Sequence, residues 1–226
     1  MNKILANCIS LGIGLGAIGV AVPVQAAPFF TGLGDLQGGS FSSQAFGVSA
    51  DGAVVVGASD GANGTEAFRW TQATGMVGLG DLPGGIFNSL ANGVSGDGSV
   101  VVGRSVINSA NGTEAFRWTQ ATGIVGLGDL PGGNFFSQTF GVSADGSVIV
   151  GSSSSANGVE AFRWTQGTGM VGLGDLSGGS FHSSANGVSA DGSVIVGRGN
   201  SGANGVEAFR WTQGTGMVGL GDLSGG

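Results

Sequence analysis

The sequence predicts an all-β protein of tandem four-stranded antiparallel repeats of about 46 residues, resembling the blades of a β-propeller. Two recurring strings and one absence indicate this fold. Phe-Arg-Trp occurs once per repeat, and helix signals are absent after residue 26. The string Gly-Leu-Gly-Asp-Leu recurs in steps of 46, 48, 46 and 47 residues, beginning at Gly32, Gly78, Gly126, Gly172 and Gly219.

Residues 1–26 form a predicted signal peptide. Lys3 precedes an apolar stretch, Ile9 to Val22, and residues 24–26 match a small-x-small cleavage signal. A retained N-terminal anchor is the alternative, but the 14-residue stretch is short for a membrane span of about 20 residues. We therefore expect the mature chain to be secreted or held at the cell surface, without inserting into a membrane.

Charge and composition exclude several classes of partner. Past residue 26 the chain has six Arg against 14 acidic residues, a net charge of −8. Nucleic acids and anionic lipids require a basic surface, so neither is an expected partner. No Cys follows residue 26, so stability must come from packing between repeats and not from disulfides. The 50 Gly residues favour disorder, but the apolar residues that stay in phase indicate a folded array.

The first half of each repeat is predicted to be a hairpin. In the first repeat, residues 44–50 and 53–56 flank Asp51-Gly52, a pair that favours a tight turn because both central residues need positive φ. The second strand is apolar without alternation, which is typical of a strand buried on both faces. Four central residues of these strands are expected to be almost fully buried: Val55, Val101, Ile149 and Ile195.

The second half of each repeat supplies two more strands. Residues 66–71 alternate, so that Phe68 and Trp70 share one face. Residues 76–82 form the fourth strand, whose glycines allow a neighbouring sheet to approach closely. Pro83-Gly84-Gly85 then ends the unit.

These patterns divide the chain into a signal peptide, one lone strand and four repeats. The lone strand, at residues 27–40, is equivalent to the last strand of a repeat. The repeats cover residues 41–85, 86–133, 134–179 and 180–226. The first three strands of the blade to which residues 27–40 would belong are missing from the repeat pattern. We therefore expect the repeats to form an open or strained arc, whose exposed strand edges favour self-association.

The repeat resembles the extracellular HAF repeat of bacteria. Ala-Phe-x-Trp, Leu-Gly-Asp-Leu-x-Gly-Gly and Gly-Val-Ser-Ala-Asp-Gly-Ser-Val-Val-Val-Gly follow one another through essentially the whole mature chain. That family is named for a His-Ala-Phe string, and here Glu takes the place of the His, at Glu66, Glu114, Glu160 and Glu207. The resemblance implies an exported, surface-associated bacterial protein with propeller-like repeats, and it supplies no catalytic residues.

One Arg per repeat is the candidate for ligand contact. These residues lie between Phe and Trp at Arg69, Arg117, Arg163 and Arg210. A ring of such cations would receive acidic sugars or carboxylates. The alternative, which we favour, is structural pairing with Asp81, Asp129, Asp175 and Asp222 or with the Asp residues of the turns.

Other chemistry finds less support. The Asp-Gly pairs raise a calcium hypothesis, but neither the EF-hand loop nor the calcium-binding nonapeptide occurs, so no metal or cofactor is expected. His182 is the only His, at a position that Ser42, Asn88 and Phe136 occupy in the other copies. No Ser is marked as its nucleophile, so a hydrolytic triad is not expected.

The sequence thus favours a non-enzymatic scaffold for adhesion, with surface polysaccharide or an extracellular protein as partner. Two alternatives stay open. The chain is a passenger segment of a longer, autotransporter-like outer-membrane protein, or it is a propeller enzyme that acts on glycans. The enzyme requires acidic residues that differ between blades, whereas here they recur in every blade.

Overall fold

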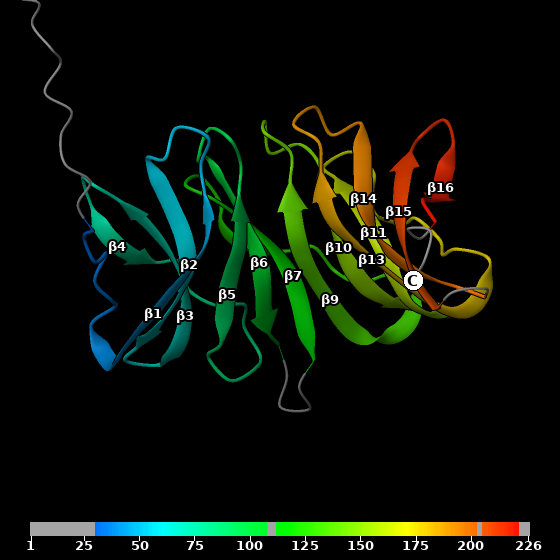
Figure 1. Ribbon diagram of the computed structural model, residues 1–226. Helices are drawn as coiled ribbons and strands as arrows, with labels where there is room; N and C mark the ends of the chain where they lie inside the picture. The colour runs from blue at the N-terminus through cyan, green and yellow to red at the C-terminus, as the bar shows by residue number, and fades with distance from the viewer. Residues whose placement is uncertain (1–29, 108–111, 203–204, 222–226) are drawn as a thin grey trace, which may run out of the picture. The chain divides into compact units, whose positions relative to one another are not determined.

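The computed structural model describes residues 30–107, 112–202 and 205–221 (Figure 1). The predicted signal peptide lies outside the described residues. The chain divides into two units, Met1–Gly32 and Leu33–Gly226, and all described strands belong to the second. Within the described ranges the structure contains sixteen strands and no helix, which confirms the all-β prediction. Accordingly, this part of the chain has no helix capable of crossing a membrane.

The strands form four blades, each an antiparallel meander of four strands. Blade 1 contains β1 (Gly38–Val48), β2 (Val54–Gly61), β3 (Gly64–Thr71) and β4 (Gly75–Gly78). Blade 2 contains β5 (Ser89–Val94), β6 (Val100–Val106), β7 (Thr113–Thr119) and β8 (Gly123–Gly126). Blade 3 contains β9 (Gly132–Val142), β10 (Ile149–Ser155), β11 (Gly158–Thr165) and β12 (Gly169–Gly172). Blade 4 contains β13 (Gly178–Val188), β14 (Val194–Ser201), β15 (Gly205–Thr212) and β16 (Gly216–Gly219).

Two strand boundaries differ from the sequence prediction. The fourth strand is shorter than expected and ends at Gly78, because the Glu66 carboxylate accepts the Gly80 N–H at 2.8 Å and turns the chain away from the ladder. The lone strand expected at residues 27–40 is not formed over residues 30–37, and strand structure begins at Gly38. The equivalent strand β4 pairs with β3 of its own blade, and residues 30–37 have no such partner in the described chain.

The Asp-Gly pairs lie in the loops that join the first two strands, but the predicted two-residue turn is wrong: Gly52 N–H donates to Ser49 O at 3.0 Å, so Ala50 and Asp51 are the central residues of the turn. Gly52 has φ of 74°, a value that L side chains rarely adopt, and Ser49 N–H donates to Val54 O at 2.9 Å across the turn. Gly98, Gly146 and Gly192 repeat this conformation with φ of 71–72°. A Gly with positive φ therefore lies in the loop of the first hairpin of each blade.

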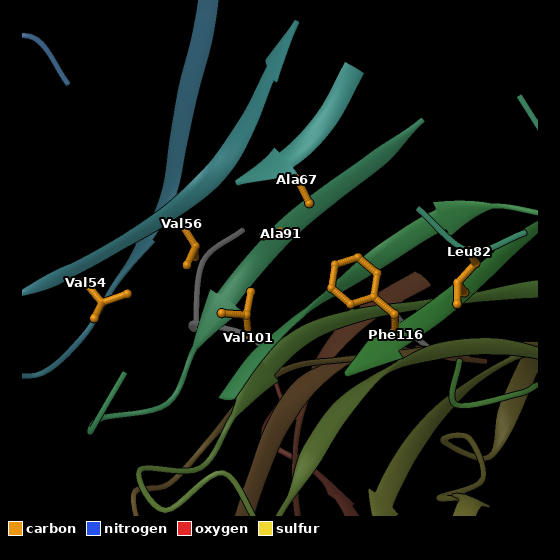
Figure 2. Close-up of a cluster of buried hydrophobic side chains, with 7 residues drawn as sticks. All are labelled: Val54, Val56, Ala67, Leu82, Ala91, Val101 and Phe116. Carbon is orange, nitrogen blue, oxygen red and sulfur yellow. The ribbon is translucent and has the colours of Figure 1, made fainter. Parts of the chain in front are cut away.

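The hydrophobic core lies between blades. The forward face of a blade is the one directed toward the next blade, and its rear face is the one directed toward the preceding blade. Figure 2 shows the first junction, where forward-face Val54, Val56 and Ala67 of blade 1 meet rear-face Val101 and Phe116 of blade 2. The same pairing recurs between Val102 and Ile149, and between Val150 and Ile195. Since each blade contributes half of a core, no blade is buried without its neighbours.

Successive blades also meet through their backbones. The third strand of one blade forms a parallel bridge to the start of the next blade, at Thr113–Phe136 and Val159–His182 between strands and at Thr65–Asn88 one residue before β5. Turn amides continue the contact, because Ala50 N–H donates to Gly96 O at 3.0 Å, and Gly96 N–H donates to Ala144 O at 2.9 Å. One geometry therefore relates each blade to the next.

Burial of the second strands is confirmed in the inner blades. Val100, Val101 and Val102 are buried, and so are Val148, Ile149 and Val150. Ile195 is buried as predicted, but the prediction for Val55 is wrong, because this side chain is only half-buried. Val55 is on the rear face of blade 1, and no preceding blade covers that face in the described chain.

Candidate functional site

The candidate site is a groove that recurs in successive blades beside the Asp-Gly turns. The groove of blade 2 has a volume of about 570 Å³, and those of blades 3 and 1 have about 420 and 500 Å³. Each is lined by the Arg-Trp-Thr-Gln segment that ends the third strand and by the turn of its blade, which contributes both Asp and Gly in blades 2 and 3 and only the Gly in blade 1. In blades 2 and 3 the Arg of the preceding blade also lines the groove.

The repeated Arg residues enter these grooves because of strand alternation. Arg69 and Ala67 are on the forward face of β3, so the Arg69 guanidinium extends toward blade 2. Its Nε and Nη2 donate to Gly98 O, each at 3.4 Å. Arg117 lines two grooves, together with Arg69 in one and with Arg163 in the other. Two cations from adjacent blades therefore lie along each of these two grooves.

The structural pairing that we favoured for these Arg residues is wrong for the described chain. Arg69, Arg117, Arg163 and Arg210 form no ion pair among the described residues. Asp81 instead accepts hydrogen bonds from the Ser105 hydroxyl and, at 3.1 Å, from Asn88 N–H. Asp222 lies outside the described residues. Asp81 and Asp175 therefore bind neighbouring segments and not the guanidinium groups, and Arg69 donates to a backbone carbonyl instead of a carboxylate.

The turn Asp carboxylates are satisfied within their own turns. Asp145 Oδ1 accepts from the Ser143 hydroxyl at 2.6 Å and from Ser147 N–H at 3.0 Å. The Ser143 hydrogen bond, followed by that of the Ser147 amide, lowers the pKa of Asp145 to about 2. The equivalent bond from Ser95 lowers the pKa of Asp97 as well. Both groups stay anionic at ordinary pH, and both line the groove of blade 2 beside its two Arg residues.

A Trp side chain adds an aromatic surface to each groove. Trp118 packs against the core between blades 1 and 2 and also lines the blade 2 groove. Trp164 has the same double position in blade 3. Phe68 and Phe116, by contrast, are fully buried core residues. Because Trp is only half-buried, part of its ring is available for contact with a ligand.

Four remaining features identified in the sequence have structural positions outside the grooves. The Glu residues that replace the family His accept the Gly amides of the connecting loops, as Glu114 does from Gly128 at 2.9 Å. His182 is at a blade junction, where its backbone N–H donates to Asp175 at 2.7 Å. Burial raises the pKa of Asp129, which lies in the loop between blades 2 and 3. Arg210 is exposed on the last described blade, outside the three grooves.

The sequence analysis did not predict which side chains lie beside each Arg in the grooves. It considered the turn Asp residues as ion-pair partners of the Arg and favoured a core position for Trp over a ligand platform, but it did not place Asp, Arg and Trp together in one groove. The available signal was the tetrad Arg-Trp-Thr-Gln, which occurs in all four copies and supplies a cation, an aromatic ring and two hydrogen-bonding side chains in sequence. Assembly of the groove also requires the next blade's turn, and sequence spacing within one repeat does not reveal that contact.

Comparisons with known proteins identify the fold. No protein-family model matches the sequence, and no curated protein matches it. Among solved structures, TolB from Acinetobacter baumannii is similar with a TM-score of 0.57 and 15% identity, over 81% of this chain and 44% of that one. The putative TolB from Agrobacterium tumefaciens has a TM-score of 0.55 and 15% identity, over 80% of this chain and 62% of that one. The chain has a TolB-like β-propeller fold and spans about half the length of these structures.

Proposed function

We propose that this protein is an exported HAF-type repeat protein that binds acidic polysaccharide at the cell surface, without catalysis. The observation that carries the proposal is the recurrence of one groove composition in successive blades, with Arg side chains that have no ion-pair partner in the described chain. A polymer that repeats its own chemical groups is a natural ligand for a scaffold that repeats its binding groups. Export rests on the pattern of residues 1–26.

The groove chemistry suits uronic acid residues. Guanidinium groups bind carboxylates through paired, charge-assisted hydrogen bonds. The Asp97 and Asp145 carboxylates can accept hydrogen bonds from hydroxyl groups, the Gln120 amide can accept or donate them, and Trp118 presents an apolar ring. Linked sites also gain avidity when one ligand spans them, so modest affinity per groove is sufficient.

The deciding experiment measures binding of polygalacturonate by isothermal titration calorimetry. Methyl-esterified polygalacturonate, which has lost its carboxylates, and neutral dextran serve as comparison ligands. We expect polygalacturonate to bind and both comparison polymers to bind at least about tenfold more weakly, a difference of about 1.4 kcal/mol. Equal binding of all three polymers would refute recognition of the carboxylate, and absence of binding would refute the proposed ligand class.

Two Arg variants locate the site. Arg117→Gln changes two grooves at once, and Arg104→Gln makes the same charge change on the same blade outside all three grooves. Both side chains are half-buried, so the pair is matched in environment. We expect Arg117→Gln to weaken binding about tenfold and Arg104→Gln to change it less than about twofold. Equal losses would indicate attraction by net charge alone.

A further inference from the structure

The two terminal blades of the described array present unmatched but complementary faces. We propose that the forward face of blade 4 binds the rear face of blade 1 in a second copy of this chain, so that copies associate head to tail. The proposal extends the interface already present between blades inside the chain. It is argued from the end faces and does not rest on the polysaccharide proposal, although one of its contact residues, Gly52, also lines the blade 1 groove.

Apolar burial is incomplete on both faces. Val196 on the forward face of blade 4 is 45% exposed, whereas its equivalents Val56, Val102 and Val150 are fully buried. On the rear face of blade 1, Val48 is 60% exposed and Ala45 is also exposed, whereas the Ala45 equivalent Ala91 is fully buried. Each face therefore carries the residues of the internal junction but has no neighbour in the described chain to cover them.

At every internal junction a Ser hydroxyl of one blade accepts a backbone N–H of the preceding blade. The two end blades each have one of these two groups without its partner in the described chain. The Ser89 hydroxyl accepts Ala67 N–H of the preceding blade at 3.0 Å and donates to Gly80 O at 2.7 Å. Ser137 and Ser183 repeat this bridge. In blade 1, the Ser43 hydroxyl donates to Gly34 O but accepts no amide among the described residues. In blade 4, the equivalent donor, Ala208 N–H, has no such hydroxyl within the described ranges.

The turn amides form a second series with matching free ends. Ala50 N–H donates to Gly96 O, Gly96 N–H to Ala144 O, and Ala144 N–H to Ala190 O. The series leaves Ala190 N–H as a donor on blade 4 and Ala50 O as an acceptor on blade 1, neither of them paired within the described part of the chain. Both series thus have their spare donor on blade 4 and their spare acceptor on blade 1, which is the polarity that head-to-tail docking requires.

The packing of the turn Gly residues has the same polarity as these hydrogen bonds. At internal junctions the turn Gly of one blade packs against the first Val of the preceding second strand, as Gly98 does against Val54. Gly52 of blade 1 has nothing within 4 Å of a Cβ built on it, and Val194, the equivalent Val of blade 4, is half-buried. A second copy placed in the internal geometry brings Gly52 onto Val194. Such a heterologous contact uses different surfaces on the two partners, so it propagates.

The test uses one blocking variant for each face, with sedimentation velocity as the measurement. Val196→Glu places a charge on the forward face, and Ala45→Glu places one on the rear face. Wild type is expected to grow in average mass with concentration, and each variant alone is expected to remain a single chain. An equimolar mixture retains one intact forward face and one intact rear face, so it should form a dimer and nothing larger.

Val171→Glu is the matched control. Val171 is 47% exposed, nearly the same as Val196, but it lies on β12 of an inner blade and on neither end face. This variant should associate as wild type does. A wild-type chain that stays monomeric at every concentration would overturn the proposal, as would a mixture of the two blocking variants that fails to dimerise. Loss of association in Val171→Glu would equally exclude these two faces as the specific contact.

Discussion

At the level of single residues, a Gly is required on the second strand of each blade wherever a buried Phe lies opposite it on the third strand. Gly103 lies opposite Phe116 on the neighbouring strand, and a Cβ at residue 103 would lie 2.6 Å from the Phe116 ring and would collide with Leu90 O. Gly57, Gly151 and Gly197 occupy the same position in the other blades. The Gly that ends each apolar run therefore makes room for the buried Phe.

Gly103→Ala is expected to destabilise the protein by about 1–3 kcal/mol or more, because the buried ring has no free space into which it can move. Gly167→Ala is the control, since no atom lies within 4 Å of a Cβ built there and its φ is not positive. That substitution should be neutral or stabilise by up to about 1 kcal/mol, through loss of unfolded-state entropy. Urea denaturation measures both, and equal effects would show that crowding at Gly103 is unimportant.

The Ser-Asp pair of each turn predicts a pH dependence. The folded pKa of Asp145 is about 2, below its ordinary value of 3.8, so its contribution to stability is present above the ordinary value and is lost as pH falls toward 2. In Ser143→Ala the pKa of Asp145 should rise toward the ordinary value, because its main hydrogen-bond donor is gone. Titration of the carboxyl carbon by NMR measures the shift, and an unchanged pKa would contradict the assigned cause.

At the level of elements, the stability of a strand depends on the neighbouring blade as much as on its own ladder. The third strands are nearly identical in sequence, but Ala115 and Ala161 are fully buried while Ala208 is exposed. The hydroxyl that bridges two blades belongs to the first strand of the following unit, as Ser137 shows for Ala115. The junction is therefore the cooperative unit of this fold.

Ser137→Ala and Ser43→Ala test the contribution of the junction to stability, because the two residues are equivalent but only Ser137 lies between two blades. The Ser137 hydroxyl is buried and makes two hydrogen bonds, so its loss leaves an unsatisfied amide and should cost about 1–3 kcal/mol. Ser43 is exposed, so its loss should change stability by less than about 0.5 kcal/mol in dilute solution. Thermal unfolding at low protein concentration decides, and a larger loss for Ser43→Ala would contradict the role of the junction.

For the molecule as a whole, the open end faces predict a gradient of local stability. Strands β6 and β10 lie between two other blades, whereas β1 and β14 each have a face that no described blade covers. Amides of β1 and of blade 4 should therefore exchange with solvent faster than those of β6 and β10. Hydrogen exchange by mass spectrometry in dilute solution measures this, and uniform protection would indicate that the end faces are covered.

Metal dependence is a second property of the whole molecule. Each turn carboxylate already accepts a Ser hydroxyl and a backbone amide, so folding should not need calcium. We expect a calcium chelator to leave the Tm unchanged. A fall of several degrees, restored by added calcium, would show that the carboxylates have a further role.

The sequence by itself determined the features that every copy repeats. Strand count, the Asp-Gly turns and the buried apolar run depend on local patterns, and those patterns recur in all four repeats. The tertiary structure alone decided what differs between copies of the same string. Val56 is buried and Val196 is exposed, and Arg117 lines two grooves while Arg210 lines none of the three. The physical reason is that side chains are buried, and grooves are formed, by contacts between adjacent blades. The sequence of one repeat does not determine whether another blade packs on each of its faces.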